Sequence, residues 1–446
     1  MEKVYLGVLA NATEPRVQLA VRGVLDFTYY AHFETHCDES LAQMDAAWAA
    51  FHDNKAVFID LEIREHFNIN KIHKLKHYID SIRSRGTADG YNTENTERLH
   101  IDLAKVGYKA TNKKAYTQQM TVWLRRQEAV HKFGSYLQWA VPGYIAEPAS
   151  DVDPKIEEES VEPPVEPDFQ VPDDSDDDEG ELDVPQAAGP TIPVYAVAKN
   201  PDFPNLTAAS ISTDFHTPDF LENLTDFLTD NSIIPTLAPS TATFFAVYKH
   251  ISLTLPTASE VTSHIVLDKI RAVKAQSMQM TSKGIKPVKA GQFDTILVRT
   301  HPPVDGEGPT SGLRVACVRV IFRLSTQCGN YPHPLAYVDW YKPLTQPVDN
   351  LGMYQVSLSS RNLRQNSTII PITDIVRSCH LIPVFGHSID TTWTSEHVLD
   401  QCQSFFLNPY LRHHDFYLLR YLFDLDISRK AEAPRRVRRG LGRAGR

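Results

Sequence analysis

Two stretches decide the fold of the second half of the chain: RVACVRVIFRL (residues 314–324) and, after one loop, LAYVDWY (residues 335–341). Further runs of this kind are separated by Pro, Gly and Asn turns and lie at 293–299, 353–358, 369–372 and 376–385. Val, Ile, Tyr and Thr, which fit a pleated and half-buried strand, dominate these runs. Several short strands with turns between them predict a small β-barrel or sandwich.

Helices are expected on both sides of these strands. Thr217 as an N-cap and Pro218 at the first helical position predict a helix before them. Residues 398–425 are predicted to close the unit as a helical end. We therefore expect residues 193–428 to form an α+β domain with a small β-barrel.

The first 145 residues are predicted to form an all-α body. Apolar residues recur with helical spacing in five segments, at about 17–29, 40–63, 70–86, 94–106 and 113–139. In the third segment Ile72, Leu75, Ile79 and Ile82 form one apolar stripe. The fifth segment is strongly amphipathic, and the residues that share one of its faces are Tyr116, Met120, Trp123, Gln127, Val130 and Leu137.

The formal net charge of −10 hides an uneven distribution. Residues 147–183 contain 17 acidic residues against one basic residue, Lys155, which gives this stretch a net charge of −16. Residues 429–446 contain eight Arg or Lys against Glu432, a net charge of +7. Both stretches are predicted to be disordered. The expected organisation is a helical domain, an acidic linker, an α+β domain and a basic tail, over residues 1–145, 146–192, 193–428 and 429–446.

Composition also indicates in which kind of cellular compartment the protein is found. The five cysteines are widely spaced and odd in number, which favours a reducing compartment over a disulfide framework. No apolar run approaches the ~20 residues that a transmembrane helix needs, so no membrane partner is expected. A short apolar run at residues 4–10, followed by Ala10-Asn11-Ala12, keeps a secretory signal peptide open as an alternative.

Four blocks in the helical half carry a family resemblance: FNINKIH (67–73), LKHY (75–78), GYNTE (90–94) and ERLHID (97–102). In order and spacing they resemble the transposases of the Plavaka elements of mushroom-forming fungi, a branch of the CACTA superfamily. The resemblance runs from Leu6 to Trp139, and residues 215–425 look like the C-terminal region of the same proteins. It implies that the helical body is a remnant of an RNase H-like transposase domain.

The resemblance also implies a metal-dependent chemistry. Transposases of this kind are thought to hold two divalent cations such as Mg²⁺, which prefer oxygen ligands, between three carboxylates. The third acid of the superfamily lies in a Glu-Arg pair on a helix. By resemblance this pair is Glu97-Arg98, so Glu97 is the candidate catalytic residue and metal ligand, with Glu94 as the fallback.

The other two acids are expected upstream of this sequence, because Asp26 and Asp60 fall within predicted helices. We therefore expect no cofactor in the isolated chain. Mg²⁺ would bind through Glu97 only if another chain completed the site, since one carboxylate cannot hold two metal ions.

Basic residues on the predicted helices and tail are candidate DNA contacts, because phosphate groups attract Lys and Arg. Lys71, Lys74 and Lys76 make the third helix basic. The candidate nucleic-acid-binding residues are His73, His77, Arg98, Arg125, Arg126, Lys132, Arg435, Arg436, Arg438 and Arg439. The alternative for the helical residues is a solvated helix face. The alternative for the tail is read-through sequence with no selected role.

The strands carry a second, weaker resemblance. Residues 314–324, 335–341 and 370–380 are similar to the bromo-adjacent homology barrel, which reads chromatin or protein partners. Trp340 and Tyr341 would then line a partner-binding pocket, or they would fill the interior of the barrel. Small β-barrels host many functions, so the resemblance alone does not choose between these roles.

These patterns together predict a nuclear, transposon-derived protein that binds DNA or a partner such as the full-length transposase. It would be the C-terminal fragment of a cut-and-paste transposase lacking two of three catalytic carboxylates, and it is not expected to act as an enzyme by itself. Three alternatives stay open. The chain is an active transposase subunit completed by another chain, a chromatin- or protein-binding module, or a decaying gene fragment without function.

Overall fold

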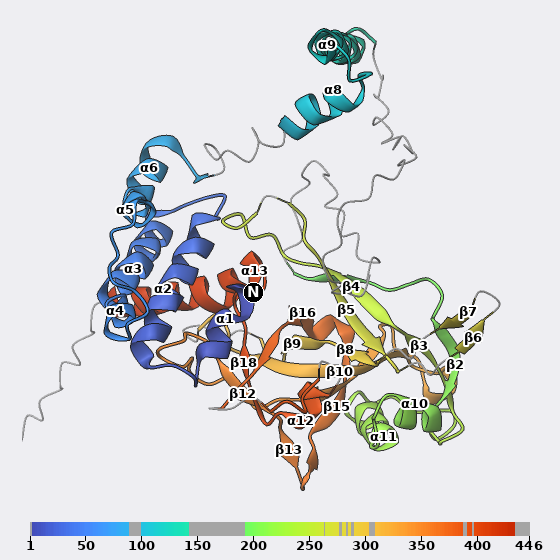
Figure 1. The fold of residues 1–446 in the computed structure, drawn as a ribbon. Helices are drawn as coiled ribbons and strands as arrows, with labels where there is room; N and C mark the ends of the chain where they lie inside the picture. The colour runs from blue at the N-terminus through green and yellow to red at the C-terminus, as the bar shows by residue number, and fades with distance from the viewer. Residues whose placement is uncertain are drawn as a thin grey trace, which may run out of the picture. The chain divides into compact units, whose positions relative to one another are not determined.

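The computed structural model describes residues 2–88, 100–141, 192–262, 264–275, 279–281, 284–286, 290–302, 308–386, 390–394 and 397–432. An N-terminal helical region and a C-terminal sheet-rich region are present, as predicted (Figure 1). The chain forms two compact units, one from residues 1–90 together with 183–446 and the other from residues 91–182. This grouping differs from the predicted domains, because the first 90 residues join the C-terminal half of the chain.

The helical region of the first unit contains α1 (Glu2–Leu9), α2 (Pro15–Ala31), α3 (Asp38–Asn54), α4 (Val57–Asp60), α5 (Asn70–Leu75) and α6 (Tyr78–Arg85). Pro15 begins α2, at a position where its missing N–H removes no helical hydrogen bond. The first two predicted helices are confirmed, as α2 and as α3 with α4. The third is present but divided into α5 and α6 at Lys76 and His77.

The sheet-rich region contains both helices and strands. Its helices are α10 (Ala208–Asp214), α11 (Phe220–Asp230), α12 (Val398–Gln401), α13 (His413–Phe416), the π-helical turn η5 (Tyr417–Tyr421) and α14 (Leu422–Glu432). Its strands are β1 (Val194–Ala196), β2 (Phe203–Thr207), β3 (Phe244–Tyr248), β4 (His250–Thr254), β5 (Leu267–Val273), β6 (Gln279–Thr281), β7 (Gly284–Lys286), β8 (Gln292–Phe293), β9 (Thr295–Arg299), β10 (Leu313–Arg323), β11 (Leu335–Trp340), β12 (Gln355–Ser357), β13 (Ser360–Arg361), β14 (Arg364–Gln365), β15 (Ser367–Pro371), β16 (Ile375–Cys379), β17 (Leu381–Pro383) and β18 (Ser404–Leu407).

Strand β10 is the centre of a seven-stranded antiparallel sheet with the order β15-β11-β10-β3-β2. One edge of β10 pairs with β11. The other edge pairs with β9 along its first half and with β3 at its end, and β9 pairs in turn with β16. A register shift between Val318 and Val320 marks the point at which β10 changes partner, and such irregularities bend a strand.

Both faces of β10 and β11 are buried, which explains why their sequences are nearly continuous apolar runs. Val318 and Val338 pack against the smaller sheet β1-β4-β5-β8. Val320 and Tyr337 point to the opposite face, where α10 and α11 cover them. Val315 packs on β12, β17 and β18 instead. The central sheet is therefore the middle layer of the sheet-rich region.

All six predicted strand segments are confirmed in β8 with β9, β10, β11, β12, β15, and β16 with β17. The predicted helical end at 398–425 is wrong in part, because it contains the strand β18 between α12 and α13. β18 is the middle strand of the sheet β12-β18-β17, and its last three residues are buried. A short apolar run of this kind does not distinguish a buried strand from a buried helix by its spacing.

The second unit contains η2 (His100–Lys105), α8 (Val106–Lys109) and α9 (Tyr116–Ala140). The fifth predicted helix is confirmed as α9, whereas residues 94–99 of the fourth lie outside the described residues. Residues 146–191 of the predicted linker and 433–446 of the predicted tail also lie outside them, and α14 extends to Glu432. No helix of the described ranges combines the length and apolar character that would let it span a bilayer.

The N-terminal helices share a core with the last helices of the chain. Phe27, Tyr30 and Trp48 belong to the same buried cluster as Phe416 and Tyr421. The rings of Tyr30 and Phe416 meet edge to face with their centroids 4.9 Å apart. In Figure 1 the blue N-terminal helices accordingly lie beside the red C-terminal helices. Neither group of helices buries its apolar face without the other.

A buried ion pair lies within this shared core. Asp26 of α2 accepts hydrogen bonds from Tyr410 Oη at 2.6 Å, from Arg420 at 2.9 Å and from Arg22 at 3.3 Å. Arg420 also contacts Asp424 at 3.0 Å. Burial by itself would raise the pKa of Asp26, but the charges of Arg420 and Arg22 outweigh burial and lower it. The carboxylate therefore stays ionised and fully engaged inside the protein.

Removing Asp26 should destabilise the first unit strongly, because Arg420 would keep its charge in a buried position without its main partner. We expect Asp26→Ala to lower the free energy of unfolding by about 3–5 kcal/mol in urea denaturation. Asp60→Ala is the matched control, since Asp60 makes an exposed ion pair with Arg16 at 2.8 Å. It should cost at most about 1 kcal/mol. Equal losses in the two variants would contradict the role of Asp26.

Gly23 sets the distance between α2 and α3. A Cβ atom at this position would lie 2.7 Å from the carbonyl oxygen of Ala47 and 2.8 Å from the backbone nitrogen of Phe51. Gly23→Ala should therefore push the two helices apart and lower the unfolding free energy by about 1–3 kcal/mol. Gly386→Ala is the control in the same unit, because its Cβ would meet nothing within 4 Å. A Gly23→Ala protein as stable as this control would disprove the close contact.

Candidate nucleic-acid interface

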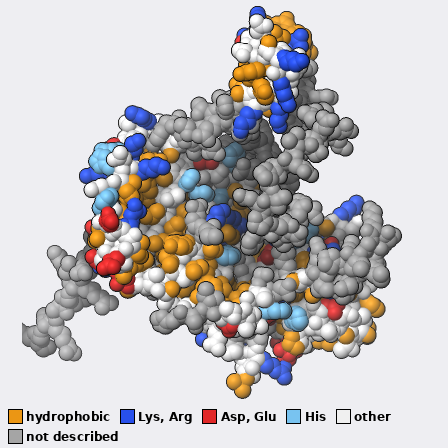
Figure 2. All heavy atoms as spheres, in the orientation of Figure 1, with side chains coloured by type: hydrophobic (Ala, Val, Ile, Leu, Met, Phe, Trp, Pro, Cys, Tyr) orange, Lys and Arg blue, Asp and Glu red, His pale blue; other side chains and the backbone are white. Residues whose placement is uncertain are grey.

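A cluster of basic side chains covers the outer face of α5 and α6. We call it the basic surface, and its exposed members are Lys71, His73, Lys74, Lys76, His77, Arg83 and Arg85. Residues 66–88 contain five Lys or Arg against the single acid Asp80, a net charge of +4. Figure 2 shows pale-blue histidines and blue cations gathered over these helices. The surface therefore attracts anions.

The apolar residues of the same segment explain why the cations point outward. Ile72, Leu75 and Ile79 pack against the core shared by the N-terminal and C-terminal helices, and Ile82 is buried in it. The ring of Tyr78 lies 5.8 Å from that of Phe27. The apolar stripe predicted from the sequence is thus confirmed as the inner face of α5 and α6. The residues between its members are left facing solvent.

Two cations lie over an aromatic ring at the base of this surface. The ring of Phe67 packs against Phe58, and its faces receive two cations, Lys55 at 5.8 Å and Arg64 at 5.4 Å from the centroid. The pKa of His52 is lowered, first by burial and then by Lys55 and Lys76. The segment before α5 is therefore held to the protein by a ring that also positions cations.

The lysines of the basic surface are available to a ligand. Within the part of the chain that the structure describes, no residue forms a hydrogen bond or ion pair with the side chains of Lys71, Lys74 or Lys76. The rings of His73 and His77 meet edge to face with centroids 5.2 Å apart. The sequence predicts that both histidines contact DNA, and the structure places them beside these lysines.

The structure does not describe the residues predicted to hold metal ions. Glu94 and Glu97, with Arg98, lie outside the described residues. Asp26 points its oxygens at two guanidinium groups and a hydroxyl, which would repel or exclude a divalent cation. Asp60 is bound to Arg16 on the surface. The contacts of Asp26 and Asp60 therefore leave neither side chain arranged to bind Mg²⁺.

The remaining predicted DNA contacts are divided between α9 and the tail. Arg125, Arg126 and Lys132 are exposed on α9, where Lys132 forms an ion pair with Glu128 at 2.6 Å. They belong to the second unit, apart from the basic surface. The predicted contacts in the tail lie outside the described residues, and they are Arg435, Arg436, Arg438 and Arg439.

Trp340 and Tyr341 lie in the interior of the sheet-rich region. Trp340 ends β11, is 6% exposed, and donates a hydrogen bond from Nε1 to Thr368 Oγ1 at 2.8 Å. Arg314 lies over its ring at 4.8 Å. Tyr341 is fully buried and meets the ring of Phe405 edge to face. This placement corresponds to core residues, the second of the two roles that the sequence left open.

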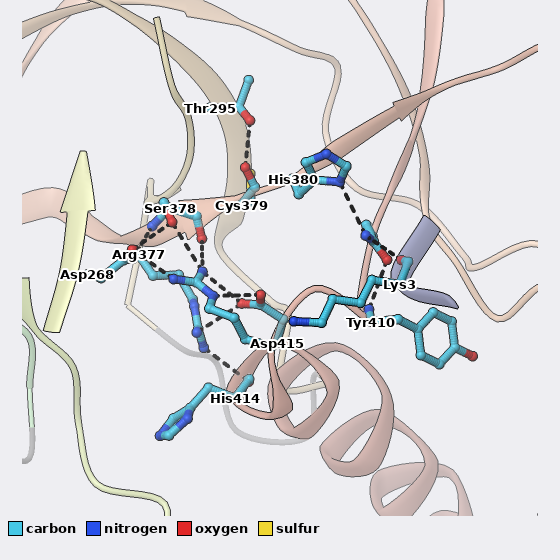
Figure 3. Close-up of polar contacts among 12 residues, drawn as sticks. Lys3, Asp268, Thr295, Arg377, Ser378, Cys379, His380, Tyr410, His414 and Asp415 are labelled. Carbon is cyan, nitrogen blue, oxygen red and sulfur yellow. Dashed lines mark hydrogen bonds and ion pairs between the residues drawn. The ribbon is translucent and has the colours of Figure 1, made fainter. Parts of the chain in front are cut away.

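Sequence reasoning missed a network of charged residues between β5, β16 and α13 (Figure 3). Arg412 donates hydrogen bonds to Asp268 at 2.8 Å and to Asp415 at 2.9 Å. Asp268 accepts from both the backbone N–H and the hydroxyl of Ser378, and Arg377 contacts Asp415 at 2.9 Å. The network joins β5, β16 and α13. It positions the C-terminal helices on which the basic surface rests.

The same network extends to the first helix of the chain. Asn408 donates a hydrogen bond to the carbonyl oxygen of Lys3 at 2.9 Å and lies 3.2 Å from Nδ1 of His380 (Figure 3). Only the pair Arg412 and Asp415 has a spacing that could have suggested an interaction, three residues apart. The other partners come from segments far apart in the sequence, so no local pattern indicated that they meet.

Comparison with known proteins adds no relative. No protein-family model, curated protein or solved structure matches this chain.

His414, at the edge of the network, should make stability depend on pH. Burial, followed by the charge of Arg377, lowers the pKa of His414 to about 4. Between pH ~6.5 and ~4 the unfolded chain binds a proton that the folded protein does not, so acidification lowers stability in this range. His414→Gln should reduce the loss between pH 7 and pH 4.5 by about 2–3 kcal/mol in urea denaturation.

The control for this measurement is His66→Gln, because His66 is exposed and lies outside the network. Its pH profile should follow that of the wild type. A His414→Gln profile that also follows the wild type would contradict the assignment of the proton to His414.

Proposed function

We propose that this chain is a transposon-derived nuclear protein that binds DNA through the basic surface of α5 and α6. The observation that carries the proposal is the exposure of Lys71, Lys74 and Lys76, on α5 and at its C-cap, with no hydrogen-bond or ion-pair partner among the described residues. Cations arranged in this way release counterions from phosphate groups when they bind, which supplies affinity without sequence preference.

The way the surface is supported also favours this function. A charged face on a flexible segment would lose conformational entropy on binding. Here Ile82 is buried and Ile72, Leu75 and Ile79 are packed, so the backbone that carries the lysines is already ordered. Groups that are ordered beforehand give up less entropy on association.

The resemblance to Plavaka-type transposases supports the same proposal, because two of its blocks, residues 67–73 and 75–78, form this surface. We propose further that the helices of the first unit descend from an RNase H-like transposase domain. We also propose that the sheet around β10 is a small barrel related to the bromo-adjacent homology barrel. The change of partner along one edge of β10 supports the curvature that such a barrel needs.

Reversing the charge of the basic surface should weaken DNA binding. We expect Lys71→Glu/Lys74→Glu/Lys76→Glu to bind a 30-base-pair duplex at least about tenfold more weakly than the wild type at 100 mM salt. The slope of log affinity against log salt should become shallower by about one for each phosphate group that the variant no longer binds. Fluorescence anisotropy with a labelled duplex measures both quantities.

The matched control is Lys269→Glu/Lys342→Glu/Arg361→Glu, which makes the same change of charge at three exposed positions of the sheet-rich region. It should bind almost as well as the wild type. Equal weakening by the two variants would mean that net charge alone drives binding, and no duplex binding by the wild type would refute the proposal. Mg²⁺-dependent nicking that Glu97→Gln abolishes would instead support a transposase subunit.

A further inference from the structure

Helix α9 exposes a stripe of aromatic and cationic side chains. Arg125, Lys132, Tyr136 and Trp139 are spaced by seven, four and three residues, which places them on one helical face. We call these four residues the α9 stripe. Trp139 is 82% exposed and Tyr136 is 55% exposed. Figure 2 shows hydrophobic and cationic side chains intermixed on this helix.

The aromatic rings of the stripe are spaced like a ladder. The centroids of Tyr136 and Trp139 lie 5.9 Å apart, and Phe133, itself 61% exposed, lies 6.4 Å from Tyr136 with its ring nearly parallel. From Arg125 to Trp139 the stripe extends over about 21 Å at the helical rise. The rings of Phe133, Tyr136 and Trp139 therefore follow one another along α9.

The opposite face of α9 is the one that packs within its unit. A Cβ atom on Gly107 of α8 would lie 3.2 Å from the ring of Trp123 and 3.8 Å from Met120. These two residues belong to the apolar face predicted from the sequence, and both are half-buried. The α9 stripe is therefore not the face that joins α9 to α8.

We propose that the α9 stripe binds single-stranded nucleic acid, with unpaired bases stacked on Trp139 and Tyr136 and phosphates held by Arg125 and Lys132. Aromatic rings for stacking, combined with cations that contact the backbone, are the arrangement by which proteins bind single strands without sequence preference. The faces of paired bases are covered by their neighbours in a duplex, so the rings select unpaired bases. The helix carries a net charge of +2 from Arg125, Arg126, Lys132 and Glu128, which complements phosphate.

A second copy of the chain fits this face less well. A twofold interface brings the same patch of both subunits together. In-register pairing of the α9 stripe with itself, parallel or antiparallel, would place Lys132 of one copy close to Lys132 of the other, which is costly at an interface. The single-stranded ligand is thus favoured by charge as well as by the exposed rings. It adds a second surface to the protein and does not depend on the duplex binding proposed above.

The test compares binding of the full-length chain to labelled dT20 and to the 30-base-pair duplex. Tyr136→Ala/Trp139→Ala should weaken binding to dT20 by at least about tenfold and leave duplex binding within about twofold. Tyr136→Phe/Trp139→Phe keeps both rings and should restore dT20 binding. Tyr116→Ala is the matched control, because Tyr116 is exposed on the other face of α9, and it should bind dT20 like the wild type.

Three results would overturn the proposal. The first is unchanged dT20 binding by Tyr136→Ala/Trp139→Ala. The second is an equal loss of duplex and dT20 binding in this variant. The third is a wild-type dimer that the variant converts to a monomer, since a second copy would then occupy the stripe. The variant Lys71→Glu/Lys74→Glu/Lys76→Glu is expected to lose duplex binding and to keep dT20 binding. The duplex and dT20 measurements therefore test the basic surface and the α9 stripe separately.

Discussion

The contact between Asp26 and Arg420 joins the N-terminal helices of the first unit (residues 1–90 and 183–446, below called the main unit) to its C-terminal helices. Both side chains are taken out of water, and breaking such a buried pair is costly. Tyr410 and Arg22 also bind the Asp26 carboxylate, and Asp424 also binds Arg420, whose Nε atom has no hydrogen-bond partner among the described residues. The pair tolerates little displacement, so it fixes the position of α2 relative to the C-terminal helices. The elements that pack on α2 are positioned by it in turn.

The position of the basic surface also depends on this ion pair, because α5 and α6 pack on the core that contains it. α5 and α6 rest on the core that α2 and α3 build with the C-terminal helices. The α9 stripe is organised differently, since its rings and cations project from a single helix supported on one side by α8. One surface suits a run of phosphates, and the other suits bases without pairing partners.

Spacing and composition were enough to predict the strands around β10, the helices α2, α3 and α9, and the inner face of α5 and α6. These elements have strong local patterns, because their apolar residues recur with the period of a helix or fill a strand that is buried on both sides. The lysines of the basic surface follow from the same pattern, as the residues between the apolar positions. Local pattern therefore predicted which residues of α5 and α6 face solvent.

Local sequence patterns did not predict that the two ends of the main unit pack against each other. Asp26 and Arg420 lie on ordinary amphipathic segments, and nothing near either residue indicates a partner 394 positions away. The same holds for Asp268 and Arg412. The strand β18 was mistaken for helix because its few apolar residues fit both structures, and only its neighbours β12 and β17 decide between them. Trp340 likewise could be assigned to the interior only once the layers on both sides of β11 were known.

The pairing of distant ends has a consequence for how the protein is made. A ribosome adds roughly 5–20 residues per second, so α2 leaves the exit tunnel about 20–80 seconds before the segment that carries Arg420. During this interval Phe27, Tyr30 and Trp48 have no C-terminal core to join, and their apolar faces are open to chaperones and to other nascent chains. The main unit reaches its final packing only after synthesis of almost the whole chain.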